Sequence, residues 1–205
     1  MNTIYAGPTG SGKTTKLLEK YIEITGGDKT DHCLVFVKNA ASVSDWRSRI
    51  ELEEMGPLNV YTYYGFVQQE MASFWPRVEA ELVGGLKTIE PTFMNVETSH
   101  YIMSKYVEKN RARKEVFDYI NATSTQIAVQ LIDNLNQAAM NCLSFSDLED
   151  RLLAWAGADT EKIAIFNEAI AVIKIFREFC VNNRIIDYSL MVDLYNKQLL
   201  NNDHY

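Results

Sequence analysis

The segment GPTGSGKT at residues 7–14 limits the possible folds of this chain more than any other feature. It matches the pattern G-x-x-x-x-G-K-[ST] at every defined position. The segment Thr3-Ile4-Tyr5-Ala6 before it predicts a short buried strand, and apolar residues recur at helical spacing after it. A glycine-rich turn between a strand and a helix is the setting in which this pattern binds phosphate groups.

The chemistry expected of this turn follows from its residue types. Glycines let the backbone curve so that its N–H groups point inward, and the next helix adds the partial positive charge of its N-terminus. Lys13 is expected to bridge phosphate oxygens as the catalytic cation, and Thr14 to offer its hydroxyl to Mg²⁺. The predicted nucleotide-binding residues are Gly7, Pro8, Thr9, Gly10, Ser11, Gly12, Lys13, Thr14 and Thr15.

Short β-rich segments alternate with amphipathic helical segments over the first third of the chain. Strands are predicted at residues 3–6, 33–37 and 58–62, with helices following the glycine-rich turn and at residues 44–54 and 66–75. This alternation favours parallel crossover units. We therefore expect an α/β fold: an incomplete P-loop NTPase parallel sheet with an inserted or appended all-helical subdomain.

From about residue 96 onward the apolar residues repeat at helical spacing. Capping-box patterns at Thr123-x-x-Gln126 and Ser146-x-x-Glu149 predict helix starts, and further helices are expected to begin near Asp159 and Asp187. The predicted division is residues 1–90 as the first part of the P-loop subdomain, 91–185 as the helical insert, and 186–205 as a helix returning to the first part.

Composition excludes several classes of protein. A net charge of −7 gives no global attraction to nucleic acid, so any such contact must be local. Three cysteines and three histidines are scattered along the chain, which indicates neither a disulfide framework nor a zinc site. No apolar run approaches the roughly 18 residues that span a bilayer, so we expect a cytoplasmic protein without membrane contact.

Hydrolysis of a bound triphosphate requires more than this turn, namely an acidic residue on a neighbouring strand that holds Mg²⁺. Asp133, Asp187 and Asp193 follow apolar residues, but all three lie in helical patterns and are expected to be caps or exposed helix acids. Either the protein continues beyond Tyr205, or this domain binds nucleotide without hydrolysing it.

Five segments, in their order along the chain, carry a resemblance to the N-terminal part of the UvrD-like superfamily 1 DNA helicases. In the second segment, at residues 34–41, Lys38-Asn39 stands where the family usually has Asn-Lys. In the third segment, at residues 60–66, Tyr63 and Tyr64 replace Phe and His. In the fourth, Ser189 replaces an acidic residue. The segments are the turn at 7–15, LVFVKNAA at 34–41, VYTYYGF at 60–66, IDYSLM at 186–191 and the final HY at 204–205.

The resemblance implies an ATP-binding fragment of an ATP-dependent DNA helicase, an ATP hydrolase that acts in DNA repair with ATP and Mg²⁺. The fragment would end just before the Walker B magnesium strand and lack the C-terminal motor domain, so alone it is expected to be inactive. The implied partners are single-stranded DNA and a duplex junction. The implied nucleic-acid contacts are Phe36, Lys38, Asn39, Thr62, Tyr63 and Tyr64.

These contacts also have a physical basis. The Phe36 ring could stack on a base, while polar residues at the strand ends could bond phosphates. The same ring could instead be core, and the tyrosines could be packing between sheet and helices. One cluster of basic residues also has two interpretations, because it could contact duplex DNA or form a solvated helix face. Its members are Lys105, Lys109, Arg111, Arg113 and Lys114.

Two other functions remain open at this point. A small-molecule P-loop kinase would use the helical half as a lid over its acceptor. A non-catalytic, nucleotide-dependent interaction domain would bind nucleotide without any motor activity.

Overall fold

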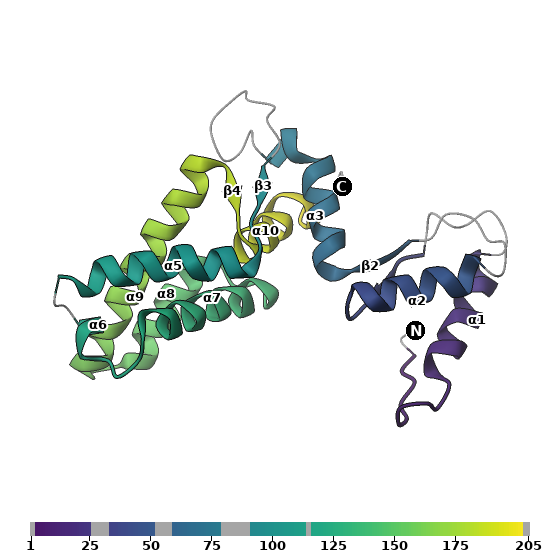
Figure 1. The fold of residues 1–205 in the computed structure, drawn as a ribbon, viewed down its shortest axis with the longest axis horizontal. Coiled ribbons are helices and arrows are strands. Elements are labelled where there is room, and N and C mark those ends of the chain that lie inside the picture. The colour runs from purple at the N-terminus through teal and green to yellow at the C-terminus, as the bar shows by residue number, and fades with distance from the viewer. Residues whose placement is uncertain (1–2, 26–32, 52–58, 79–90, 114–115, 203–205) are drawn as a thin grey trace. The chain divides into compact units, whose positions relative to one another are not determined.

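The computed structural model describes residues 3–25, 33–51, 59–78, 91–113 and 116–202 of the chain (Figure 1). Contacts divide it into two compact units, Met1–Phe66 and Val67–Tyr205. Each unit has its own core. The predicted boundary at residue 90 falls on residues outside the described ranges.

The described residues of the first unit form two helices, two short strands and the start of a third helix. These elements are α1 (Lys13–Thr25), β1 (Val35–Val37), α2 (Ala40–Glu51), β2 (Val60–Thr62) and the first residues of α3 (Tyr63–Ser73). The strands pair in parallel, with Val35 opposite Val60 and Val37 opposite Thr62. This confirms the parallel pairing expected of strands joined through a helix.

The core of the first unit is small and aromatic. Tyr21 of α1 and Trp46 of α2 meet edge to face at 6.3 Å between ring centroids. Ile50 and Val60 are buried beside them, and Val35 and Val37 pack against this cluster. The helices therefore pack against one face of the strand pair.

The predicted α/β P-loop NTPase sheet is wrong. Of the described residues 73% are helical, and the described sheets are two parallel pairs. Residues 3–6 form no strand, and the Ile4 side chain is 90% exposed. The apolar pattern of this segment therefore does not bury it, and the described strands form two separate pairs in place of the usual sheet of about four to six strands.

The second unit is a helical assembly. Its main helices are α5 (Val96–Arg111), α7 (Ser124–Met140), α8 (Phe145–Ala156) and α9 (Thr160–Asn183) (Figure 1). Met103, Ile132 and Phe176, from three of these helices, are almost fully buried. The shorter elements are α6 (Val116–Tyr119), α10 (Tyr188–Leu194) and a π-helix, η2 (Tyr195–Leu200).

A second parallel strand pair joins distant parts of this unit. β3 (Thr92–Phe93) pairs with β4 (Ile185–Ile186), with Thr92 opposite Ile185. These strands precede α5 and α10 respectively, so the pair fixes the starts of two helices that lie far apart in the sequence. Neither strand was predicted, because two residues carry no detectable alternation.

Most predicted helix starts in this unit are confirmed. Thr123 and Gln126 form the reciprocal capping box of α7. Asp159 caps α9 and Asp187 caps α10. The box predicted at Ser146 is wrong, because Ser144 and Asp147 form it instead and α8 begins one residue after Ser144.

Within the described residues, none of the helices has the length and apolarity needed to cross a bilayer.

Candidate nucleotide and nucleic-acid sites

The glycine-rich turn leads directly into α1. Gly10 and Gly12 have φ angles of +81° and +78°, in the left-handed region that favours glycine. Ser11 N–H donates to the Pro8 carbonyl at 3.3 Å, and Lys16 N–H donates to the Gly12 carbonyl at 3.0 Å. The turn is therefore hydrogen-bonded within itself and to the first turn of the helix.

Lys13 lies inside this turn. Its ammonium donates to the carbonyl oxygens of Gly7 at 2.6 Å and Pro8 at 2.7 Å, and to Ser11 Oγ at 3.2 Å. The chain consequently wraps around the cation. All three acceptors are neutral oxygens, so a phosphate oxygen would be a stronger partner for the same ammonium.

Two further features restrict the shape of the turn. A Cβ atom on Gly7 would lie 2.7 Å from Ser11 Oγ, so only glycine fits there without a shift. Lys16 Nζ lies 5.0 Å from the centroid of the Tyr5 ring. This cation–π contact joins the residues on the two sides of the turn.

The residues present fit a polyphosphate. Thr14 and Thr15 are exposed in the first turn of α1, which contains no acidic residue. The positive end of the helix is thus free of a competing carboxylate from its own first turn. Pro8, Thr9, Gly10, Ser11 and Gly12 are exposed as well, so an anion can reach the turn.

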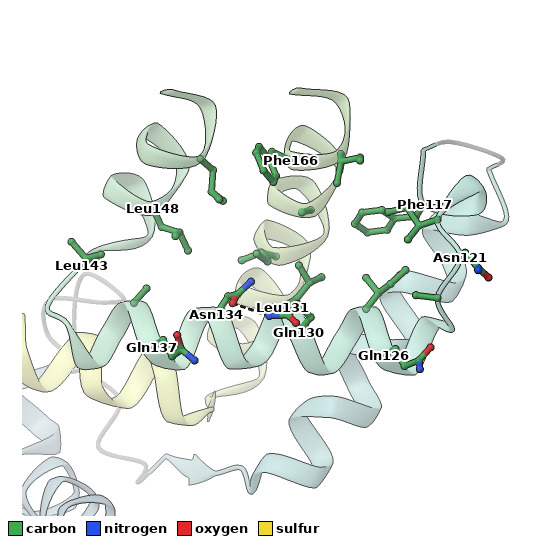
Figure 2. A pocket seen from close by; sticks show the side chains of 18 of the residues that line it. Phe117, Asn121, Gln126, Gln130, Leu131, Asn134, Gln137, Leu143, Leu148 and Phe166 are labelled. Atoms are coloured by element: carbon green, nitrogen blue, oxygen red, sulfur yellow. Dashed lines mark hydrogen bonds between the residues drawn. The ribbon is translucent and has the colours of Figure 1, made fainter. Parts of the chain in front are cut away.

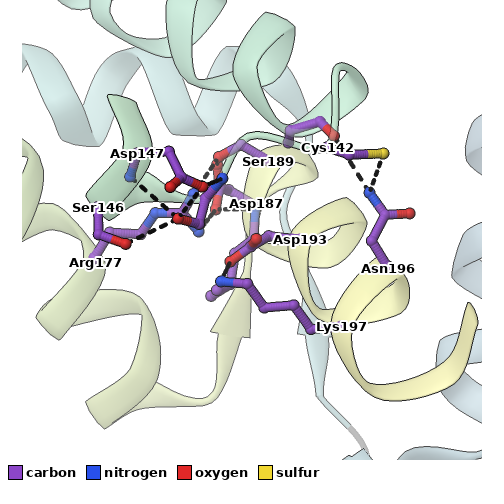
Figure 3. Close-up of polar contacts among 12 residues, drawn as sticks. Cys142, Ser146, Asp147, Arg177, Asp187, Ser189, Asp193, Asn196 and Lys197 are labelled. Atoms are coloured by element: carbon purple, nitrogen blue, oxygen red, sulfur yellow. Dashed lines mark hydrogen bonds and ion pairs between the residues drawn. The ribbon is translucent and has the colours of Figure 1, made fainter. Parts of the chain in front are cut away.

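Of the candidate magnesium acids, Asp133 and Asp193 lie within helices, and Asp187 lies between β4 and α10. Asp187 is buried, caps α10, and receives hydrogen bonds from Ser189 Oγ at 2.6 Å and Arg177 at 3.4 Å (Figure 3). Asp193 pairs with Lys197, and Asp133 is exposed on α7. Among the residues that the structure describes, no three His, Cys, Asp or Glu side chains gather in a way that could hold a metal ion.

The predicted nucleic-acid residues come together at the ends of β1 and β2. Because these strands are parallel and Val37 lies opposite Thr62, the residues after each strand lie at the same edge. Lys38 and Asn39 follow β1, and Tyr63 and Tyr64 follow β2. Lys38 and Tyr64 are exposed there.

Phe36 belongs to an aromatic cluster on the other face of the strand pair. Its side chain is 50% exposed, while Val35 and Val37 pack towards the core. Its ring centroid lies 5.2 Å from that of Phe66 and 6.2 Å from that of Tyr63. The structure thus places Phe36 outside the core, but in ring contact with its neighbours.

Two of the predicted contacts cap helices, a role that we did not assign from the sequence. Asn39 Oδ1 accepts hydrogen bonds from Ser42 N–H and Ser42 Oγ at the start of α2. Thr62 Oγ1 accepts the Gly65 N–H at the start of α3. Asn and Thr immediately before a helix are the signal that would have indicated both caps.

The basic concentration in α5 does not form one free face. Lys105 pairs with Glu108 at 3.0 Å. Arg111 donates to the carbonyls of Ala122 and Ile120, which holds the segment before α7. Lys109 and Arg113 are exposed, and Lys114 lies outside the described residues.

Comparison with protein-family models, curated proteins and solved structures found no match for this chain.

Proposed function

We propose that the chain binds a nucleoside triphosphate, ATP, together with Mg²⁺, through the turn at residues 7–15. The observation that carries this proposal is the position of Lys13, whose ammonium lies inside a turn shaped by two left-handed glycines at the start of a helix. Backbone N–H groups, a helix N-terminus and one lysine form a phosphate site without any further cofactor.

Each residue has a distinct part in this proposal. Lys13 exchanges the carbonyls of Gly7 and Pro8 for phosphate oxygens, and Gly10 and Gly12 allow the backbone to approach the phosphates. Thr14 would ligate Mg²⁺, which would neutralise part of the phosphate charge, and Thr15 would add a second hydroxyl. Phosphate binding alone does not make the chain a hydrolase.

We further propose single-stranded DNA as the second ligand, bound at the ends of β1 and β2. Supporting features are the half-exposed Phe36 ring, the exposed Lys38 ammonium and the exposed Tyr64. A tyrosine is neutral near pH 7, and partial burial raises the pKa of the Tyr64 phenol further, so this side chain carries no charge that would repel phosphate. An aromatic ring beside a cation is the usual basis of sequence-tolerant binding to single strands.

Together these two sites favour the ATP-binding part of a DNA translocase, and the finer proposal is a UvrD-like helicase. The resemblance of the five segments supports that finer assignment, which also names a duplex junction as a partner. Binding of both ligands by one chain distinguishes it from a small-molecule kinase, which needs no nucleic acid.

Calorimetric titration with Mg·ATP tests the nucleotide site. We expect Lys13→Ala to weaken binding at least tenfold, because charged hydrogen bonds to phosphate are each worth about 1.5–3 kcal/mol. Lys20→Ala is the matched control, since Lys20 is an exposed lysine of the same helix and should leave the affinity unchanged. Equal affinity of the Lys13→Ala variant and the wild type would remove the proposal.

A further inference from the structure

A groove of about 810 Å³ lies in the second unit, between α7, α8 and α9 (Figure 2). Phe117 of α6 lines it at one end, as does Asn121 in the segment that follows. Most of its lining is aliphatic or aromatic, including Leu131 of α7, Leu148 and Leu152 of α8, and Phe166 of α9. Its size is that of ordinary ligand sites, which are mainly apolar with a few placed polar groups.

The polar groups of the groove are carboxamides, and most of them follow one helix. Gln126, Gln130, Asn134, Gln137 and Asn141 all line the groove from α7 and from its C-terminal cap, at intervals of three or four residues. All five are exposed, and Figure 2 shows the first four following one another along the helix. We call this set the amide row.

The two end members of the amide row make hydrogen bonds within the chain, because Gln126 Oε1 accepts the Thr123 N–H and Asn141 Nδ2 donates to the Gln137 backbone carbonyl. The three middle members retain hydrogen-bonding capacity. Gln130 Nε2 donates to Asn134 Oδ1 at 3.0 Å, which leaves the Gln130 oxygen and the Asn134 nitrogen available. The Gln137 carboxamide has no partner among the residues that the structure describes. Each of these side chains can therefore both donate and accept at the rim of an apolar groove.

The spacing of the row matches an extended backbone. Four residues of helix rise about 6 Å, and two residues of an extended chain advance about 6.6 Å. Every second residue of an extended peptide presents its N–H and C=O on the same edge. The three middle carboxamides of the row, Gln130, Asn134 and Gln137, span about 10 Å and can thus pair with the three same-edge residues of a strand of about six residues.

The absence of charged residues in the lining restricts the kind of ligand that the groove can bind. None of the residues that line the groove is charged, so a charged ligand would lose hydration without gaining a partner. A helix could offer the carboxamides only side chains, because its own backbone groups are already paired, whereas an extended segment offers a regular row of backbone groups. An acyl chain has no polar groups for them at all.

We propose that this groove binds an extended, uncharged segment of a partner protein, with alternate apolar side chains on the groove floor and its backbone on the amide row. The proposal is independent of the nucleotide site, which lies in the other unit. It assigns the partner by chemistry alone: a stretch of about six residues with an apolar residue at every second position.

Selection from a phage-displayed library of random twelve-residue peptides on the complete chain tests the proposal. Enriched peptides should share alternating apolar residues without charges in that stretch. Fluorescence anisotropy should then show binding at least tenfold weaker for Gln130→Ala/Gln137→Ala, because two hydrogen bonds are lost. Alanine is the better helix former, so α7 should remain intact.

Two controls separate backbone recognition from general stickiness. Gln69→Ala removes an exposed carboxamide of α3 and should leave affinity unchanged. N-methylation of alternate backbone nitrogens in an enriched peptide should abolish binding, because the edge donors disappear. The proposal is overturned if no peptide is enriched, or if the enriched peptides have apolar residues spaced three or four apart. It is also overturned if N-methylation of the peptide or the double substitution in α7 leaves the affinity unchanged.

Discussion

The ammonium nitrogen of Lys13 lies 2.6 Å from the carbonyl oxygen of Gly7, six residues earlier in the chain. The same lysine also contacts Ser11 Oγ, and Ser11 Oγ occupies the space that a Gly7 side chain would need. The three residues therefore form one closed arrangement. Its geometry depends on the absence of a Cβ at position 7.

Gly7→Ala should weaken Mg·ATP binding several-fold, because the new Cβ would lie 2.7 Å from Ser11 Oγ and displace the hydroxyl that contacts the Lys13 ammonium. Ser11→Ala in the same chain removes that oxygen and leaves Cβ as the neighbour, at 3.3 Å. We expect the double variant to bind better than Gly7→Ala alone. Calorimetry on the four proteins of this cycle measures the coupling, and strictly additive losses would argue against it.

Phe36→Ala should weaken binding of an oligothymidylate by roughly tenfold, since stacking of one base on an aromatic ring is worth about 1–3 kcal/mol. Fluorescence anisotropy at fixed salt measures this affinity. Phe74→Ala is the control, because Phe74 is also a partly exposed phenylalanine but belongs to the second unit. Unchanged affinity of Phe36→Ala would exclude base stacking at this ring.

Asn39→Asp separates capping of α2 from contact with nucleic acid. Aspartate caps a helix as well as asparagine does, so the free energy of unfolding should change little. A carboxylate at the strand end would repel phosphates, so affinity for the oligothymidylate should fall. Asn39→Ala, in contrast, should lower the free energy of unfolding by about 1 kcal/mol. Full DNA affinity in Asn39→Asp would mean that Asn39 only caps the helix.

The sequence predicted features that depend on local signals. Thr123, Asp159 and Asp187 start helices because each side chain can accept the first N–H groups of the helix that follows. The choice between Ser144 and Ser146 was missed because both serines precede an acidic residue three positions later. In the structure Asp147 bonds both the N–H and the hydroxyl of Ser144.

Features that depend on distant contacts were not predictable. The pairing of Thr92 with Ile185 has no local pattern, and the exposure of Ile4 depends on whether other strands lie beside it. The intervals between the carboxamides of α7 are visible in the sequence, but they acquire meaning only when α8 and α9 form the groove beside them. Of the candidate site, the lysine and its glycines were predicted, whereas the capping roles of Asn39 and Thr62 were not.

Arg177→Met should lower the free energy of unfolding by about 3–5 kcal/mol, because it leaves the buried Asp187 carboxylate without its cation. Asp187→Asn in the same chain should recover part of this loss, since a neutral amide still caps α10. Urea unfolding measures both. Lys174→Met breaks an ion pair with Glu149 in which the lysine is exposed. This substitution should lower the free energy of unfolding by no more than about 1 kcal/mol. Similar losses of unfolding free energy in Arg177→Met and Lys174→Met would contradict a larger stabilising contribution from the buried Arg177–Asp187 pair.

Cys180 should resist thiol reagents in the folded protein. Burial, with a further contribution from Asp187, raises the pKa of its thiol to about 12, so almost no thiolate forms near pH 8. Cys142 is exposed and should react with Ellman's reagent at once. Mass spectrometry of the labelled chain identifies the sites, and Cys142→Ser serves as the control. Rapid labelling of Cys180 before unfolding would show that the core around α9 is not closed.

Stability should depend on Asp159 at acid pH. Backbone hydrogen bonding from Lys162, then its side chain, lowers the pKa of the Asp159 carboxyl below its usual value of about 3.9. The contribution of the carboxylate is therefore complete above that value and is lost as the pH falls through the lowered pKa. Asp159→Asn should match the wild type near neutral pH but show a shallower loss of stability below about pH 4. Urea unfolding at several pH values measures this, and identical pH profiles would contradict it.

The most direct test of the nucleotide site is a ¹⁵N–¹H spectrum of chain labelled only at its 10 glycines. Addition of Mg·ATP should shift the amide signals of Gly7, Gly10 and Gly12 and leave those of Gly65 and Gly157 in place. In Lys13→Ala, the same addition should shift the turn glycines only at much higher nucleotide concentration. Glycine signals of the turn that do not move at millimolar Mg·ATP would contradict phosphate binding at residues 7–15.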